Sequence, residues 1–531
     1  MVLRGTDVRT KPFRDIMIQL ILCIITLILI LLYAGAFEKE LYGDEFFSFG
    51  LANSDEGLFY YQERYYEKCG VGGWLSGEDL RSWMEVAPDK RFQYEYVWKN
   101  QADDVHPPFY YLLLHTLCSF FVQNHSKALG MMINLVAGGF LFLGLIKWFA
   151  SLRESEGETD RERNAFLPVL LLVMMPAFFA VVQYIRMYVL LMAECIWVGF
   201  FLYRMLRDKR FTNRQAVCLF ILIVIGGLTH YYFYLYCFFT ALFVGTMMLV
   251  RRYDKNIIIK YLSVWIVGVG CALLIFPPAL RHMFLSYRGK EVRQNLSTDF
   301  SIFGEFARDI CKWTVPLWLC LAIGIIVIIA GRHKRMRLDK DLAIISFGMI
   351  VATLVIMKTA IYSQSYYIAP FFALLALIIS DLLYKSFIHR RGWLYVGVGL
   401  VLLVMGLSAW KNQWQPARNY VVVQNDVRQQ IDAIGPVDCY FVQRDTEWHV
   451  LFDNWIGELS RCDEWTIGHE EEFPDGWFYK VAGDRITLEN PLILLIRQEF
   501  WNEQDWMDKD AFQLLGTMND YCFLQYIGVS N

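Results

Sequence analysis

Charged residues are scarce in this sequence, and several familiar patterns are missing from it. Only 19% of its 531 residues are Asp, Glu, Lys or Arg, whereas an ordinary soluble protein has about a quarter. The 12 cysteines form no C-x-x-C pair and no Cys/His set with metal-ligand spacing, which argues against a zinc module or a disulfide framework. There is also no internal repeat and no low-complexity segment. The composition therefore disfavours a soluble enzyme, a repeat protein and a disordered chain.

Apolar residues are abundant instead, and they are gathered in blocks. The chain is 56% hydrophobic and 16% aromatic, with a mean hydropathy of +0.33. About eleven blocks reach or approach the roughly 20 residues that a helix needs to cross a bilayer. They lie at residues 16–37, 128–149, 166–185, 188–206, 216–234, 235–250, 257–279, 313–330, 342–361, 366–384 and 393–410. The blocks predict a mainly α-helical, polytopic membrane protein. The first is too long for the apolar part of a cleavable signal peptide, so we expect it to be retained.

A shorter apolar stretch at 109–122 decides the orientation. Runs of about 10–14 residues are more often interfacial or re-entrant than membrane-spanning. If this stretch does not cross, every short basic loop lies on the same side as the basic N-terminal tail, as the positive-inside rule requires. We therefore predict a plasma-membrane protein with a cytoplasmic N-terminus. The segment 38–127, which contains the interfacial helix, and the loop 280–312 are then extracytoplasmic.

The sequence predicts two domains. Residues 1–411 form a transmembrane domain with a long first outer loop. Residues 412–531 form a small extracytoplasmic α/β domain, because strand-like segments such as "CYFVQ" and "PLILLI" alternate with a helical stretch near 424–434. The segment "YCFLQYIGV" supplies a further predicted strand. Loops as long as 38–127 are usually functional or disordered.

Polar side chains are concentrated at the predicted outer ends of the spans. Asp44 and Glu45 follow the first span, and His106 precedes Pro107 and Pro108 at the interfacial helix. Polar groups in or near a membrane are costly and mark candidate functional sites. The other candidates are Arg186, Tyr188, His230, Tyr231, Arg281, Lys358 and Tyr366.

Several of these candidates also have a simpler explanation. Interfacial tyrosines such as Tyr231 often anchor a helix at the membrane surface, and Lys358 and Arg281 can extend to lipid headgroups. Arg186 is a stronger candidate because it lies in a very short turn between two apolar segments. Asp44 is the strongest candidate, because a carboxylate is repelled by anionic lipid headgroups and gains nothing by extending to them.

The order of these motifs resembles a known group of enzymes. "GDE" after the first span, "HPPFYYLLLH", "QYIRMY", "THYY" and a late "YYIAPFFALLALI" follow one another along the chain. Over about residues 10–410 this pattern resembles the GT-C superfamily of membrane glycosyltransferases. It is closest in kind to family 39, the aminoarabinose-transferase-like bacterial members and the protein O-mannosyltransferases.

The resemblance implies a donor, a side of the membrane and site residues. The donor would be a polyprenyl- or dolichyl-phosphate sugar, with transfer on the outer face. Asp44 matches the catalytic acid, with Glu45 beside it, and His106 and Arg186 match family motif positions. One departure is Ser365, which stands before Tyr366 where many relatives have an arginine. Lys358 or Arg281 would have to replace that arginine.

The chemistry of such a transfer agrees with these residue types. A carboxylate can remove the acceptor's proton as its oxygen or nitrogen attacks, and we predict that Asp44 is this base. The leaving phosphate is stable as an anion and needs positive charge rather than a general acid; Arg supplies it bidentately. A single base without a carboxylate nucleophile predicts inversion. If the segment is helical, Glu45 points away from Asp44 and serves another role, such as orienting a basic neighbour. Asp44, Glu45 and His106 are also candidate ligands of a divalent cation.

The expected partners are the lipid-linked sugar donor, membrane lipids and an extracytoplasmic glycan, lipid or protein acceptor. We expect no nucleic-acid partner. Three alternatives stay open: a transporter or flippase of lipid-linked sugars, a membrane sensor whose outer tail binds a ligand, and a catalytically inactive GT-C relative. Transporters usually place polar sites at mid-bilayer and contain inverted repeats. Neither feature is visible here, which favours the enzyme.

Overall fold

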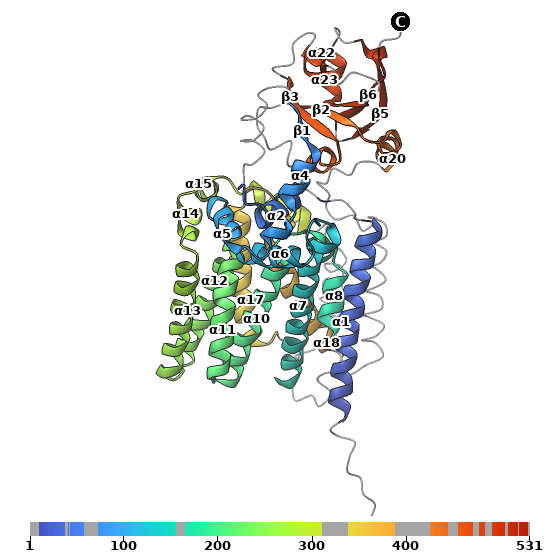
Figure 1. The fold of residues 1–531 in the computed structure, drawn as a ribbon. Coiled ribbons are helices and arrows are strands. Elements are labelled where there is room, and N and C mark those ends of the chain that lie inside the picture. The colour runs from blue at the N-terminus through green and yellow to red at the C-terminus, as the bar shows by residue number, and fades with distance from the viewer. Residues whose placement is uncertain are drawn as a thin grey trace, which may run out of the picture. The chain divides into compact units, whose positions relative to one another are not determined.

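The fold is described from a computed structural model of the chain (Figure 1). It describes residues 10–37, 41, 43–57, 73–155, 165–310, 338–387, 425–443, 455–470, 477–483, 491–504, 508–518 and 520–528.

The described part of the chain contains six helices that are long and apolar enough to cross a membrane. They are α7 (Lys127–Ser155), α10 (Tyr188–Asp208), α12 (Tyr231–Val250), α13 (Lys255–Ile275), α17 (Lys340–Thr359) and α18 (Ala369–Phe387), the last preceded by the 3₁₀ turn η2 (Ser365–Ile368). The prediction of a mainly α-helical multi-pass membrane protein is confirmed.

The predicted count of about eleven spans is not confirmed. The predicted spans 313–330 and 393–410 lie outside the described residues. The predicted span 166–185 is two short helices, α8 (Leu167–Val173) and α9 (Pro176–Gln183). They are separated because proline lacks the N–H of a helical hydrogen bond and drives the residue before it into an extended conformation.

The predicted spans 216–234 and 235–250 meet at a different residue in the structure. The predicted boundary was between residues 234 and 235. Helix α11 (Asn213–Thr229) ends earlier, and His230 separates α11 from α12. His230 has φ −157° and ψ 142°, an extended conformation that interrupts the helix. The first predicted span corresponds to α1 (Thr10–Phe37).

The chain divides into two compact units. The membrane unit comprises Met1–Phe37, Val105–Tyr110 and Met131–Ala417, and the sheet unit comprises Glu38–Asp104, Tyr111–Gly130 and Arg418–Asn531. The predicted outer loop therefore supplies residues to both units, and most of them belong with the C-terminal residues.

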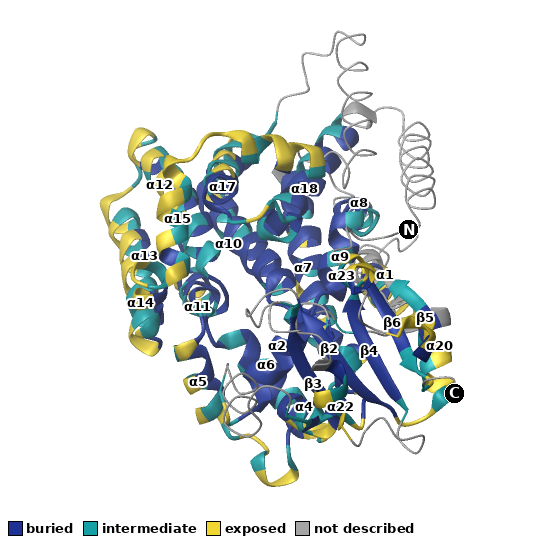
Figure 2. Cartoon of the chain, turned by 90° about the horizontal axis from the view of Figure 1, so that it is seen from above, coloured by how far each residue is buried: buried dark blue, intermediate teal, exposed yellow. Residues whose placement is uncertain are grey.

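Helix α10 is the buried centre of the membrane unit. It contacts α11, α12, α17 and α18, and it is dark blue along most of its length in Figure 2. Of its most apolar stretch, 78% is buried within the protein, compared with 22% for α13. Helix α13 therefore presents most of its apolar side chains outward, as a lipid-facing helix does, whereas α10 is surrounded by protein.

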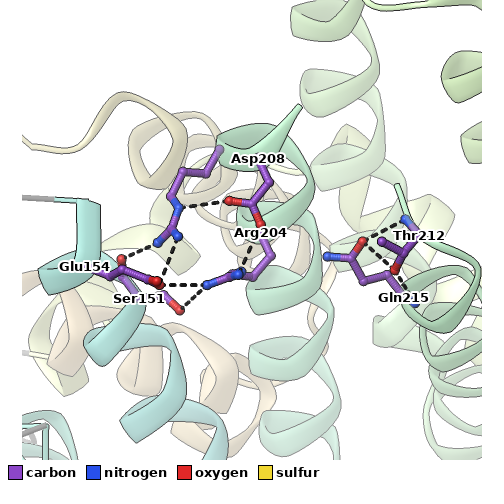
Figure 3. Close-up of polar contacts among 7 residues, drawn as sticks. Ser151, Glu154, Arg204, Asp208, Thr212 and Gln215 are labelled. Carbon is purple, nitrogen blue, oxygen red and sulfur yellow. Dashed lines mark hydrogen bonds and ion pairs between the residues drawn. The ribbon is translucent and has the colours of Figure 1, made fainter. Parts of the chain in front are cut away.

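An ion-pair network joins α7 to α10 at the end of the bundle that carries the basic turns (Figure 3). The Glu154 carboxylate lies 2.9 Å from the guanidinium groups of both Arg204 and Arg207. Beside it, Thr212 and Gln215 form a reciprocal capping box that starts α11. A capping box of this kind satisfies two backbone N–H groups that the first turn of a helix leaves without partners.

The sheet unit contains six strands in the order β1-β3-β2-β4-β6-β5. Strand β2 pairs in parallel with β3 and β4, and the other pairings are antiparallel. The strands are β1 (Leu75–Ser76), β2 (Asp438–Gln443), β3 (Glu464–His469), β4 (Leu492–Arg497), β5 (Phe512–Met518) and β6 (Tyr521–Tyr526). The predicted strands coincide with β2, β4 and β6, and the predicted helix with α20 (Asn425–Ile434). Strands β3 and β5 were not predicted, and β1 comes from the predicted outer loop.

Short helices complete both units. The sheet unit contains α2 (Gly43–Asn53), α4 (Gly77–Met84), α5 (Tyr94–Asp103), most of α6 (Phe109–Phe120), α21 (Ile456–Leu459), α22 (Trp477–Ala482) and α23 (Gln498–Glu503). The membrane unit adds α14 (Pro278–Phe284) and α15 (Tyr287–Ser297). Helix α6 has 12 residues, well below the roughly 20 that a span requires.

Candidate functional site

The acidic pair lies in the first turn of α2, in the sheet unit. Asp44 and Glu45 sit where the unpaired N–H groups of a helix favour negative charge. Several contacts hold this helix: Asn53 donates to the Met84 carbonyl in α4 at 2.6 Å, and Asn100 of α5 donates to the Leu51 carbonyl at 3.2 Å. The acidic turn is therefore part of a firmly packed group of helices.

The two acids have different surroundings. Glu45 is 0% exposed, and its two carboxylate oxygens lie 2.5 Å and 2.6 Å from Nζ of Lys127, the first residue of α7. Asp44 is half-buried, and its backbone carbonyl accepts from the Ser48 hydroxyl at 3.0 Å. Neighbouring residues of a helix project in different directions, and Glu45 indeed binds a basic neighbour. Lys127 is a residue that the sequence analysis missed.

Four other candidates meet in the membrane unit. Arg186 lies buried in the turn between α9 and α10, and Tyr188 begins α10. His230 lies buried between α11 and α12. Arg186 interacts electrostatically with both Tyr188 and His230, and His106 also interacts with His230. The structure thus brings His106, Arg186, Tyr188 and His230 together from three separate stretches of the chain.

Aromatic rings surround His230. Its ring centroid lies 5.5 Å from that of Tyr188 and 4.6 Å from that of Tyr232. Tyr366 of η2 lies 4.7 Å from Tyr188. Centroid distances of this size are those at which aromatic pairs attract one another. We call the whole set the tyrosine cluster, and it comprises Tyr184, Tyr188, His230, Tyr232, Tyr366 and Tyr367.

His230 is neutral in this setting. Burial, and after it the electrostatic interactions with His106 and Arg186, lowers the pKa of His230 from 6.5 to about 3. Its Nδ1 accepts the backbone N–H of Tyr232 at 3.0 Å, which caps α12. Since a neutral imidazole carries one ring proton, the proton resides on Nε2. His230 can therefore donate one hydrogen bond from Nε2 without carrying charge.

Three further candidates make other contacts. The Tyr231 hydroxyl lies 2.7 Å from Nδ1 of His282 in α14, and Arg281 of α14 is exposed. Buried Lys358 donates to the Thr298 hydroxyl at 3.0 Å, to the carbonyls of Thr298 and Asp299 at 3.3 Å each, and to the Asn295 carbonyl. An ammonium group has three protons, so these oxygens use its donor capacity. In this structure Lys358 fastens the C-terminal end of α15 to α17.

Arg288 is a second residue that the sequence analysis missed. It lies on α15 and interacts electrostatically with Tyr232 and Tyr367 of the tyrosine cluster. Its guanidinium is 3.1 Å from the Glu291 carboxylate in the next turn. The only signal in the sequence was its place in the loop 280–312, which contains several basic residues.

A divalent cation finds no ready ligand set among the described side chains. There, no three His, Cys, Asp or Glu residues are grouped as metal ligands. Of the three predicted ligands, Glu45 has both oxygens engaged by Lys127.

Comparison with known proteins gives a likeness in structure alone. No family model and no curated protein matches the sequence. This chain resembles ArnT. The structure of ArnT from Cupriavidus metallidurans bound to undecaprenyl phosphate is 12% identical, with a TM-score of 0.49, over 96% of this chain and 97% of that one. The apo structure of ArnT is 11% identical, with a TM-score of 0.41, over 83% and 93%. ArnT is a GT-C glycosyltransferase, the superfamily that the motifs resemble. The activity of this chain has to be inferred from its own residues.

Proposed function

We propose that this protein is a membrane glycosyltransferase that moves a sugar from a polyprenyl-phosphate donor to an extracytoplasmic acceptor. The observation that carries the proposal is the tyrosine cluster together with Arg186 and Arg288. It gathers aromatic rings, a neutral imidazole and two guanidinium groups at the ends of apolar helices. These groups suit the three parts of a lipid-linked sugar. Apolar helices can bind its isoprenoid chain, the guanidinium groups can bind its phosphate, and the aromatic rings can pack against its sugar.

The donor phosphate is assigned to Arg186 and Arg288. As the glycosidic bond breaks, negative charge develops on the phosphate, and a positioned guanidinium stabilises it with charge-assisted hydrogen bonds. The neutral Nε2–H of His230 donates to the phosphate or to a sugar hydroxyl. The phosphate leaves as an anion, so no general acid is required.

The acceptor's proton is assigned to Asp44. The acceptor atom attacks the anomeric carbon and transfers its proton to the Asp44 carboxylate. Glu45, held by Lys127, acts as the support of α2 rather than as a second base. A single displacement assisted by one base inverts the configuration at the anomeric carbon. The stereochemistry of the product therefore tests this mechanism.

The decisive experiment compares Asp44→Asn with Asp55→Asn in full-length protein reconstituted into lipid. Labelled polyprenyl-phosphate sugars are supplied with an extract of cell-envelope acceptors, and transfer is measured. Removal of a general base lowers the rate by about 10²- to 10⁴-fold. Asp55 is the control, because it forms only a partly exposed pair with Lys90. Equal rates for the two variants would refute the role of Asp44.

A second arm tests the donor contacts and the rival function. Arg186→Gln and Arg288→Gln should raise the KM for the donor by roughly tenfold to a hundredfold, because each removes a charge-assisted hydrogen bond. A transporter would move the labelled donor between leaflets without cleaving it. Donor movement without sugar transfer would therefore replace this proposal with the flippase alternative.

A further inference from the structure

Glu194 is an acid buried in the centre of the membrane unit. It lies in the interior of α10 and is 1% exposed. Among the described residues no cation pairs with it, and its Oε2 atom has no hydrogen-bond partner. A carboxyl group inside a membrane bundle is costly and calls for a function.

One hydrogen bond holds the Glu194 side chain. The Thr229 hydroxyl lies 2.7 Å from Oε1 of Glu194 and 3.0 Å from the carbonyl oxygen of Ile225. The hydroxyl donates to this carboxyl oxygen, the nearer of its two acceptors. Because no cation pairs with the carboxyl group among the described residues, its neutral form avoids burying a charge without a counter-ion.

The titratable groups around Glu194 do not supply a counter-charge. The thiols of Cys195, on the same helix, and of Cys237, on α12, interact with the carboxyl group. Neither is a cation. Thr229 of α11 is the one hydrogen-bonding partner that is observed for it among the described side chains.

Thr229 connects Glu194 to the tyrosine cluster. It is the last residue of α11, and the next residue is His230. Tyr188, whose ring contacts His230, lies six residues before Glu194 on α10, a rise of roughly 9 Å. The turn that carries His230 is thus bound to α10 twice, by the Tyr188 ring and by the Glu194 carboxyl.

We propose that Glu194 is a positioning residue of the donor site: its neutral carboxyl group accepts the Thr229 hydroxyl proton and so holds His230 against Tyr188. The expected effect on donor binding rests on the proposed function, in which the tyrosine cluster is the donor site. The contact between Glu194 and Thr229 is observed in the structure itself. The side chain touches no reacting atom, so it acts through Thr229 and His230.

The test exploits the chemical difference between an amide and an alkyl group. Glu194→Gln keeps an accepting oxygen for the Thr229 hydroxyl and has the shape of the neutral acid, whereas Glu194→Leu has similar size and no acceptor. We expect Glu194→Leu to raise the KM for the donor about tenfold with a smaller change in kcat, because a buried hydroxyl loses its partner. Glu194→Gln should retain the wild-type KM. Cys195→Ala, at the next position of the same helix, is the control.

Two measurements need no transferase activity. The infrared difference spectrum between wild type and Glu194→Gln should contain the carbonyl band of a protonated carboxyl group at neutral pH. Hydrogen exchange of the turn at 229–233 should be about tenfold faster in Glu194→Leu and unchanged in Glu194→Gln. Thr229→Val should reproduce the effect of Glu194→Leu.

The outcomes separate the two proposals. If no donor is transferred or bound by the wild type, the proposed function fails, while the infrared and exchange results still decide the role of Glu194. If the protonated band is absent, or if Glu194→Gln disturbs the turn as strongly as Glu194→Leu, the positioning role is overturned. Normal exchange and a normal KM in Glu194→Leu would overturn it as well.

Discussion

His230 shows how far a single side chain depends on its surroundings. In the tyrosine cluster it is buried between rings, with its Nδ1 committed to the backbone of α12. A histidine in water titrates near neutral pH, but this one holds its neutral form well into the acidic range. The tyrosine cluster therefore contains an imidazole that is unable to switch its charge at physiological pH.

This burial makes stability depend on pH. The pKa of His230 falls from 6.5 to about 3 on folding. Between these two pH values, His230 is protonated in the unfolded chain and neutral in the folded chain. Stability is then fully present above pH 6.5 and is lost as the pH falls. Between pH 6.5 and about pH 5 this single group should cost roughly 1–2 kcal/mol. His230→Asn, which keeps a capping side chain, should lack this component in melting curves recorded across the range. At pH 8 the imidazole is neutral in both the folded and the unfolded state. The difference in melting temperature between His230→Asn and wild type at this pH therefore measures the part of the substitution's effect that does not depend on pH.

Parallel pH profiles of melting temperature for the two proteins would contradict the lowered pKa of His230.

The pair of Glu45 and Lys127 predicts a large effect of a single substitution. Lys127→Met leaves a fully buried carboxylate without its cation, which should cost about 3–5 kcal/mol. Lys90→Met removes a similar pair with Asp55 whose side chains are 32% and 29% exposed, so it should cost less than about 1 kcal/mol. Melting temperatures of the two variants in the same lipid give the comparison. The double variant Glu45→Met/Lys127→Met should recover much of the loss, and equal melting of the two single variants would count against the buried pair.

Individual candidate residues could be selected from the sequence only where the residue type itself was unusual. Asp44, Arg186 and His230 stand out because acids and bases are rare at the ends of apolar segments. Lys127 and Arg288 do not stand out, since a lysine at the start of a span and an arginine in a basic loop are ordinary. Their importance follows from long-range contacts with Glu45 and Tyr232, which no local pattern encodes.

At the level of elements, hydrophobic blocks predicted where the long helices lie but not where they break. The interruption at His230 depends on a side chain that caps the following helix, and the composition on either side is uniformly apolar. The central strands β2 and β4 were predictable because strands buried on both faces are nearly continuous apolar runs. Strand β1 has only two residues and pairs with β3 from far along the chain, so it has no local signature.

Helix α15 provides a prediction at this scale. Lys358 binds the carbonyl oxygens at its C-terminal end, where a positive charge also complements the helix dipole. Lys358→Met should free those carbonyls and let α15 open about tenfold more often or more. Hydrogen exchange of residues 287–297, followed by mass spectrometry, measures this opening. Lys340→Met, at the exposed start of the same helix α17, is the matched control. Unchanged exchange in Lys358→Met would show that α15 is held by other contacts.

For the whole molecule, the distribution of basic residues predicts which side of the membrane each end faces. The basic loops predict a cytoplasmic N-terminus, with α14 and α15 outside. In a background without reactive native cysteines, Gln294→Cys should react with a membrane-impermeant maleimide on intact cells. Arg210→Cys, also at an exposed position but in a basic turn, should react only after permeabilisation. The reverse pattern would place the proposed chemistry on the cytoplasmic side and refute transfer on the outer face.

The pairing of β1 with β3 also has a consequence for the order in which the molecule forms. Trp74, beside β1, donates to the carbonyl of Val481, 407 residues later. At about 5–20 residues per second, a ribosome needs roughly 20–80 s to make that intervening stretch. For this time the early segment has no partner strand, and the membrane helices between the two must already have been threaded. Contacts of such long range form slowly and leave strand edges exposed. During biosynthesis, this protein is therefore most prone to aggregation before its last hundred residues have been synthesised.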